Sequence, residues 1–190
     1  MKTLNRINII IILLVAIGFK ATAQLAVPAN YGSSISYGLE TNMAVGPVTQ
    51  DFKTGPALVV RGEYHMTGCF NLTGSVGLLT LLPTSTYAFY LKYNHVGYKT
   101  DNFIPLKVGG KYYLTENWYT EAETGAVLYT SHYTMPAFAL GAGTGVSYIM
   151  DNYRAIDFGI HFENWTRQTV IGENNVSQLI GLRVAYKFGL

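Results

Sequence analysis

The chain has 190 residues and a formal net charge of +2. Although 49% of its residues are hydrophobic, only 13% are charged, which is typical of a protein that faces lipid as well as water. Three of the 13 Lys and Arg residues lie within the first 20 positions, so the rest of the chain has 10 basic and 11 acidic residues. This balance argues against a nucleic-acid-binding protein, which needs a basic surface. Cys69 is the only cysteine, which excludes an intrachain disulfide, a cysteine-based zinc site and a CxxC redox motif.

The N-terminus has the pattern of a secretory signal peptide over residues 1–23. Lys2 and Arg6 precede a thirteen-residue apolar run, and small residues occupy the two positions that determine cleavage, the second of them Ala23. We therefore expect cleavage between Ala23 and Gln24. A membrane anchor is the alternative, but thirteen residues fall short of the roughly 20 that span a bilayer.

The mature chain, residues 24–190, is predicted to be a single outer-membrane β-barrel domain. It has no run of 18 apolar residues that would indicate a transmembrane helix. Instead, segments of about ten residues alternate apolar and polar side chains, as from Leu58 to Met66, and turn residues separate them. This pattern predicts an all-β fold, an eight-stranded antiparallel up-and-down transmembrane barrel. We place its strands at 33–44, 57–67, 70–82, 103–114, 118–130, 137–150, 154–164 and 176–188.

The connections between the predicted strands alternate in length. Short turns occupy 68–69, 115–117 and 151–153, and longer loops occupy 45–56, 83–102, 131–136 and 165–175. Outer-membrane barrels have short turns on the periplasmic side and long loops outside, and an even number of strands leaves both termini at the turns. Within the longest loop, we expect Tyr87 to Tyr98 to extend the third and fourth strands as a hairpin.

Aromatic residues gather beside the short turns and the C-terminus. In a barrel they would form a ring at the periplasmic interface, where amphipathic rings are favoured. The ring would consist of Tyr64, Phe70, Tyr112, Trp118, Tyr148, Tyr186 and Phe188. A water-soluble β-sandwich or lipocalin-like barrel is the alternative, because alternation alone does not tell which face of a strand is inside.

The polar faces of the strands carry nearly all of the charge within them, and the signs nearly cancel. Pooled, they hold five cations, six carboxylates and two histidines: Glu40, Arg61, Glu63, His65, Lys107, Lys111, Glu121, Glu123, Asp157, His161, Glu163, Arg183 and Lys187. The interior of an eight-stranded barrel is just wide enough for side chains to fill it, and unpaired buried charges are costly. We therefore expect paired charges to plug the interior. A narrow polar channel is the alternative.

The expected turns also predict which interior residues face each other across neighbouring strands. Lys111 is expected directly opposite Glu121, which is an attractive cross-strand pair. The inward face of the sixth strand is made of small residues, which would leave space for long polar side chains on the seventh. Its predicted facing pairs are Gly143 with His161 and Gly141 with Glu163.

The motifs favour neither an enzyme nor a metal site, and we expect no catalytic residues, cofactor or metal. His161, Glu163 and a nearby hydroxyl could be imagined as a hydrolytic triad. Lipid A deacylases among small barrels, however, have the nucleophilic serine two residues after the histidine, where this chain has Glu163, and no GxSxG motif is present. His65 and His161 show no metal-ligand spacing either.

Three stretches of the chain carry a resemblance to a known family. They are Thr54–Ala57 with Arg61–Tyr64, Ile104–Tyr113 with Trp118–Gly125, and Val184–Phe188. In these stretches the chain resembles the bacterial outer-membrane β-barrel domain family, especially the small eight-stranded barrels of Bacteroidetes type. The resemblance implies a place in the outer membrane, contact with its lipid, and insertion by the barrel-assembly machinery, which reads an aromatic C-terminal strand. Here Gly189 and Leu190 follow the last aromatic, and because most members have no assigned role, the resemblance implies no site residues.

These observations predict a structural or interaction role that the surface loops exert. The loop 83–102 is the expected contact surface, because it carries Tyr87, Phe89, Tyr90, Tyr93 and Tyr98. The same aromatics would equally stabilise a hairpin by pairing across its strands. The alternatives are a narrow channel, a subunit of an envelope or secretion complex with an unidentified protein partner, and a lipid A-modifying enzyme.

Overall fold

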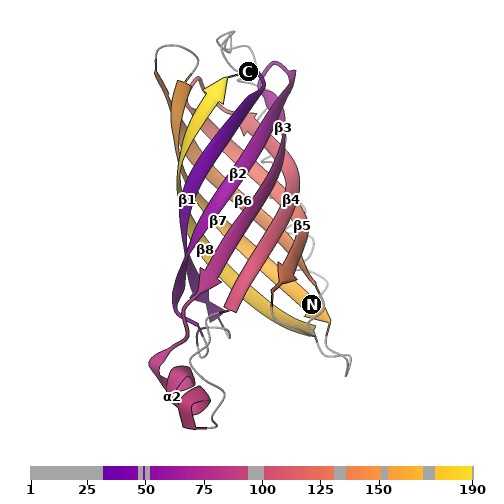
Figure 1. The fold of residues 1–190 in the computed structure, drawn as a ribbon. Helices are drawn as coiled ribbons and strands as arrows, with labels where there is room; N and C mark the ends of the chain where they lie inside the picture. Colours follow the sequence, from indigo (N-terminus) through magenta and orange to yellow (C-terminus); the bar gives the residue numbers. More distant parts are fainter. Residues whose placement is uncertain are drawn as a thin grey trace, which may run out of the picture.

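A closed barrel of eight antiparallel strands is the main feature of the structure, a computed structural model that describes residues 32–46, 49, 52–93, 101–130, 136–150, 154–168 and 174–189. The strands are β1 (Ser34–Val45), β2 (Thr54–Thr67), β3 (Phe70–Leu81), β4 (Asp101–Tyr113), β5 (Trp118–Tyr129), β6 (Ala137–Met150), β7 (Arg154–Gln168) and β8 (Asn174–Gly189). They pair in sequence order, and β8 pairs with β1 to close the barrel (Figure 1). The predicted signal peptide, with its cleavage between Ala23 and Gln24, lies outside the described residues.

All eight predicted strands are present, and three of them, β2, β7 and β8, are longer than the sequence pattern indicates by three residues or more. Strand β2 begins at Thr54, which pairs with Met43, and β7 continues to Gln168, which pairs with Asn174. The backbone ladder continues beyond the alternating residues because hydrogen bonds between strands require no particular side chain. The loops on either side are correspondingly shorter than predicted.

The predicted hairpin between Tyr87 and Tyr98 is wrong in its first half, where the chain forms the helix α2 (Ser85–Tyr93). Residues 94–100 lie outside the described residues. Helix α2 projects past the barrel at the end opposite the C-terminus (Figure 1). A segment without a neighbouring strand satisfies its backbone groups locally, and the first helical bond here runs from the Ala88 amide to the Thr84 carbonyl at 2.8 Å. Thr84 precedes the helix, a position where threonine is favoured.

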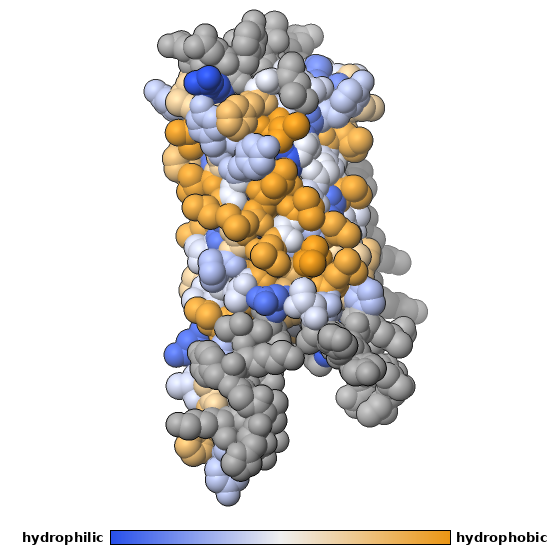
Figure 2. Space-filling view, in the orientation of Figure 1, coloured by the Kyte–Doolittle hydropathy of each residue, from blue (hydrophilic) through white to orange (hydrophobic). Residues whose placement is uncertain are grey.

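The strands present their apolar face outward. Leu39, Leu58, Val108 and Leu140 are each 58% or more exposed, and apolar residues cover the middle of the visible wall of the barrel (Figure 2). The charged residues of the same strands are buried inside. This is the arrangement of a barrel in lipid rather than in water, so the water-soluble alternative is wrong.

Threonines on the outer wall have their hydroxyls satisfied within the protein. Thr120, Thr124 and Thr144 donate to the backbone carbonyls of Gly143, Ala139 and Tyr119, at 3.1, 3.1 and 2.7 Å. A free hydroxyl is costly in hydrocarbon because no water is present to bond it. The polar residues of the outer wall of β5 and β6 are therefore compatible with lipid.

Aromatic side chains surround the end of the barrel at which β8 ends, here called the turn end; α2 marks the opposite loop end. Tyr64, Trp118 and Tyr148 are 62%, 56% and 64% exposed there, and Phe70 and Phe188 are 38% and 39% exposed. The other two members of the predicted ring, Tyr112 and Tyr186, are half-buried. The positions agree with an interfacial ring, and the assignment of this end to the periplasm stays a prediction.

The interior has two zones. Charged side chains fill the middle and the turn end, whereas an apolar cluster fills the loop end. The cluster consists of Ala44, Ala57, Leu79, Leu81, Phe103, Val127, Ala137, Ala139, Trp165 and Leu179. None of the helices within the described residues has the length and apolar character needed to cross a membrane.

Candidate functional site

The polar faces predicted from the sequence do line the interior of the barrel. Of the thirteen residues pooled there, twelve are buried, none of them more than 8% exposed, and His65 at the turn end is half-buried. The strand parity places them inside: from β2 to β8 the inward residues have odd numbers, and on β1 they have even numbers. The charged side chains of this polar interior come from six strands, and β3 and β6 add buried polar side chains such as Asn71 and Ser147.

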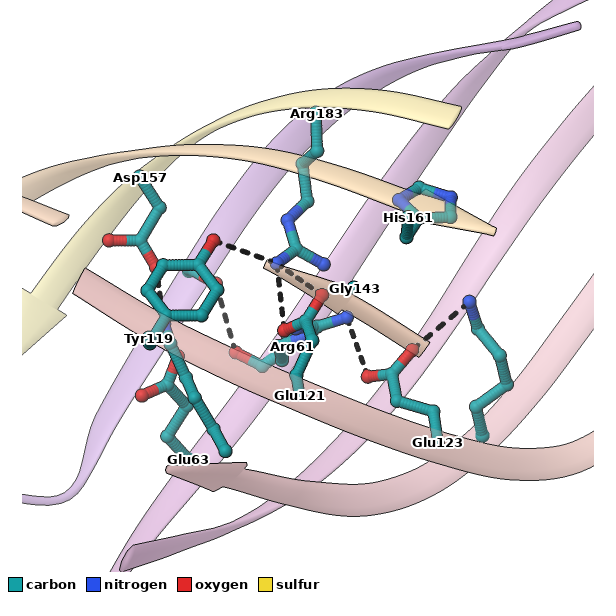
Figure 3. Close-up of polar contacts among 12 residues, drawn as sticks. Arg61, Glu63, Tyr119, Glu121, Glu123, Gly143, Asp157, His161 and Arg183 are labelled. Carbon is teal, nitrogen blue, oxygen red and sulfur yellow. Dashed lines mark hydrogen bonds and ion pairs between the residues drawn. The ribbon is translucent and has the colours of Figure 1, made fainter. Parts of the chain in front are cut away.

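Glu121 lies at the centre of this region, between two arginines from other strands (Figure 3). Its carboxylate is 2.5 Å from Arg61 Nη1 and 2.9 Å from Arg183 Nη2. Arg61 also contacts Glu123 at 2.6 Å. The ion pairs join β2, β5 and β8 across the lumen, which indicates that side chains occupy the space an open pore would need.

The chain of ion pairs continues toward the loop end. Lys107 on β4 contacts Glu123 at 3.2 Å and Glu163 on β7 at 2.5 Å. Glu163 in turn accepts a hydrogen bond of 2.8 Å from the indole N–H of Trp165. Trp165 packs on Phe103 with ring centroids 5.5 Å apart, so this contact joins the charged zone to the apolar cluster.

A second group of charges lies closer to the turn end. Lys111 is 2.9 Å from Glu63 and 2.6 Å from Asp157, and Lys187 is 2.9 Å from Glu63. Asp157 also accepts a short hydrogen bond from Ser147. Every cation here has a carboxylate in contact, as the plug hypothesis requires.

The predicted pair of Lys111 and Glu121 is correct in register but wrong as an ion pair. The two residues are cross-strand partners, yet Lys111 binds carboxylates on β2 and β7, and Glu121 binds the two arginines. On the concave face of a small barrel, side chains converge toward the axis and reach the opposite wall. The ammonium of Lys111 also lies 3.8 Å from the ring centroid of Tyr119, which holds it toward the axis.

The small residues of β6 provide the space that the sequence predicts for their neighbours. Gly143 faces His161 and Gly141 faces Glu163, as expected. A Cβ atom at 143 would lie 2.9 Å from His161 Cβ, and one at 141 would lie 3.2 Å from Glu163 Cγ. Gly145 belongs to the same predicted small face, but its neighbour was not predicted: a Cβ there would lie 2.4 Å from the hydroxyl of Tyr119 on β5.

Two buried tyrosines belong to the network but were not predicted. Tyr113 and Tyr119 are 2% and 0% exposed. Lys187 donates to the hydroxyl of Tyr113 at 2.8 Å, and Arg183 donates to that of Tyr119 at 3.2 Å. Their odd residue numbers indicate that they point into the lumen. This signal was overlooked because tyrosines are expected at the membrane interface.

The described residues contain no cluster of three or more His, Cys, Asp or Glu side chains arranged to hold a metal. His65 Nδ1 lies 3.0 Å from Asn71 Oδ1, and the nearest acidic groups to His161 Nε2 are Glu163 at 3.4 Å and Glu40 at 3.8 Å. Chemically, the interior is suited to holding charges in fixed positions. It brings carboxylates rather than a hydroxyl nucleophile to His161.

Comparison with known proteins shows the fold of the chain. No family model and no curated protein matches the sequence. Among solved structures, Neisserial surface protein A is similar with a TM-score of 0.56 at 13% identity, over 84% of this chain and 97% of that protein. Ail, the attachment invasion locus protein of Yersinia pestis, is similar with a TM-score of 0.53 at 14% identity, over 82% of this chain and 97% of Ail. The chain therefore has the fold of small bacterial outer-membrane β-barrels, in agreement with the outer-membrane location predicted from the sequence.

Proposed function

We propose that this protein is a non-conducting outer-membrane barrel that acts as an interaction protein through its loop end. The observation that carries the proposal is the pair of exposed aromatic rings on α2. Phe89 and Tyr93 are 71% and 76% exposed, and their rings stack with centroids 6.4 Å apart. Exposed aromatic side chains outside the membrane are enriched in protein contacts.

The interior supports a mechanical rather than a transport role. The ion pairs around Glu121 fill the middle of the lumen, and the apolar cluster fills the loop end. A barrel closed in this way is a rigid support that holds a binding element at a fixed height above the lipid. We also propose that the protein is not an enzyme, because His161 is directed at two carboxylates.

A known barrel of the same fold makes an interaction role plausible. Ail is by name an attachment and invasion protein, and we propose a comparable interaction role for this chain. We also propose that the chain is related to the Bacteroidetes-type barrels and that the barrel-assembly machinery inserts it. Its partner would be a protein of the envelope. Contact with membrane lipid follows from the apolar outer wall.

Crosslinking in intact cells tests the interaction role. A photo-crosslinking residue at Thr86 of α2, which is exposed, is expected to capture a defined envelope or surface partner. The double variant Phe89→Ser/Tyr93→Ser should lose that product while keeping the heat-modifiable migration of a folded barrel. Leu140→Ser, on the outer wall, is the matched control and should keep the crosslink. Capture that is unchanged in the double variant would refute the role of the aromatic pair.

A narrow channel is the second candidate, and one observation favours it. Arg61 Nε, Thr73 Oγ1 and Ser75 Oγ are buried without a hydrogen-bond partner among the described residues. Arg61 and Ser75 are cross-strand partners, and Thr73 is the next inward residue on β3, so water molecules could follow this wall. Single-channel recording on refolded protein in a planar bilayer separates the candidates: steady open-pore currents would exclude the closed barrel.

A further inference from the structure

The described part of the lumen holds one carboxylate more than its permanently charged cations. The cations are Arg61, Lys107, Lys111, Arg183 and Lys187, and the carboxylates are Glu40, Glu63, Glu121, Glu123, Asp157 and Glu163. A surplus charge shielded from solvent costs far more than one in water. This region is therefore one positive charge short of balance.

Glu40 is the carboxylate from which a close cation is missing. Each of the other five has a Lys or Arg nitrogen within 2.9 Å. The closest permanently charged nitrogen to Glu40 is Arg183 Nη1, at 3.8 Å. Glu40 Oε1 is buried and has no hydrogen-bond partner among the described residues. The missing charge therefore belongs beside Glu40, in the middle of the barrel.

His161 is in position to supply that charge. Its Nε2 atom lies 3.4 Å from Glu163 Oε1 and 3.8 Å from Glu40 Oε2. This atom too is buried and, within the described ranges, without a hydrogen-bond partner. Glu163 has a single cation, Lys107, which it shares with Glu123. The imidazole thus faces Glu40, which has no close cation, and Glu163, whose one cation is shared.

Gly181 lets the imidazole reach across a whole strand. On β8, Gly181 is the cross-strand partner of His161 on β7 and of Asn42 on β1. A Cβ atom at 181 would lie 2.1 Å from His161 Nε2 and 2.6 Å from Asn42 Oδ1. Because Gly181 has no side chain, His161 passes over β8 and approaches β1, the strand that closes the barrel.

We propose that His161 is protonated in the folded barrel and that its imidazolium, held between Glu163 and Glu40, is a proton-dependent latch across the seam of β8 and β1. The charged groups around the ring are Glu163 on its own strand, Glu40 on β1, Arg183 on β8, and Lys107 on β4 through its contact with Glu163. On β6, the facing residues are glycines and bring no charge.

The direction of the pH dependence follows from this charge balance. With the proton on His161, six positive and six negative charges balance in the described lumen. Without it, one negative charge is left unmatched beside the seam. The latch therefore stabilises the barrel at the acidic side of neutrality, and that contribution is lost as the pH rises and the proton leaves.

Nitrogen NMR on the refolded wild-type protein tests the charge directly. At about pH 7.5, where a free imidazole is mostly neutral, the two ring nitrogens of His161 should give the signals of a doubly protonated imidazolium. Backbone connectivity assigns the ring, so the measurement does not depend on any variant folding. The signals of a neutral tautomer at this pH would overturn the proposal.

A double-mutant cycle tests the latch. In urea, wild-type protein is expected to unfold severalfold faster at about pH 8.5 than at about pH 6. His161→Gln should unfold fast at both, because the charge is absent. Glu40→Gln removes the surplus carboxylate, so it should unfold slowly at both and should also rescue His161→Gln. Equal pH dependence in wild type and His161→Gln, or no rescue, would show that His161 is only a packing residue.

The second lumen histidine is the matched control. His65 contacts the amide of Asn71 rather than a carboxylate, so His65→Gln should keep the wild-type difference between the two pH values. Gly181→Ala should remove that difference, because a methyl group fills the path of the imidazole. If the pH dependence disappears in His65→Gln instead, His161 is not the residue that forms the latch.

Discussion

The two zones of the lumen fill the same barrel by different physical means. In the charged zone, Arg61, Glu121 and Arg183 are held by directional contacts of 2.5 to 2.9 Å. At the loop end, Phe103 and Leu179 are buried in an apolar cluster, where packing contacts have no fixed direction. The two zones are expected to respond differently to the loss of one side chain. A charge that loses its partner remains buried, whereas an apolar cavity leaves no charge behind.

Removal of the central carboxylate is expected to have the largest effect. Glu121→Ala leaves Arg61 and Arg183 facing each other without a carboxylate between them, which should cost about 3–5 kcal/mol of unfolding free energy. Urea titration of the refolded barrel, followed by tryptophan fluorescence, measures it. Glu121→Gln keeps the shape and should be impaired to a similar extent. If Gln restores wild-type stability, the carboxylate serves by packing rather than by charge.

A cavity at the loop end should cost less and should behave differently. Leu179 is fully buried in the apolar cluster, and Leu179→Ala should cost about 2–3 kcal/mol. It should leave the dependence of stability on pH unchanged, because it removes no charge. The same titration at acidic and alkaline pH checks this. A changed pH profile would mean that the two zones are coupled more tightly than the contact of Trp165 with Glu163 suggests.

A methyl group added to β6 should have a smaller effect, at the place where an aromatic ring and a strand approach most closely. A Cβ at 145 would lie 2.3 Å from the Phe158 carbonyl oxygen and 2.4 Å from the Tyr119 hydroxyl. Gly145→Ala should therefore displace Tyr119 and cost about 1–2 kcal/mol. Tyr119→Leu should cost less in the Gly145→Ala background than in the wild type, because it removes the hydroxyl and Cζ of Tyr119, which would lie 2.4 and 2.5 Å from the new Cβ. An equal cost in both backgrounds would place the strain in the backbone.

The smallest effect is expected on the outer wall. The hydroxyl of Thr124 donates to the Ala139 carbonyl at 3.1 Å, and hydrogen bonds of this kind in membranes contribute about 0.6 kcal/mol on average. Thr124→Val keeps the shape and should change the unfolding free energy by no more than about that amount. A large loss would indicate that the threonine faces something other than lipid.

Much of this fold could be predicted from the sequence because one rule governs it. A period of two determines which face of a strand each residue occupies. The strands, the residues that point into the lumen and the pair of Gly143 with His161 therefore follow from counting along the sequence. The same rule describes only neighbours along the wall. It places Lys111 opposite Glu121 correctly, but it says nothing about which residues meet across the lumen, where Lys111 contacts Glu63 and Asp157.

Two other features lay outside the alternating pattern. The apolar cluster contains Leu79 and Phe103, which occupy inward positions that the polar-inside expectation assigns to hydrophilic side chains. The helix α2 forms where no strand is available for pairing, although its tyrosines favour a strand. In both cases the contacts made in the folded protein determine the local structure, and the alternating pattern of the sequence does not predict those contacts.

The ion pairs of the lumen also constrain how the barrel is made. Glu121 is separated from Arg61 by 60 residues and from Arg183 by 62, and Lys187 is separated from Tyr113 by 74. Contacts between such distant residues form late, because closing the long intervening chain costs conformational entropy before the contacts stabilise it. We therefore expect the charges to remain hydrated until β1 meets β8, and the final closure to expel water and match the ions in one cooperative step. An incorrectly registered barrel would bury unmatched charges, so the network discriminates between correct and incorrect closure.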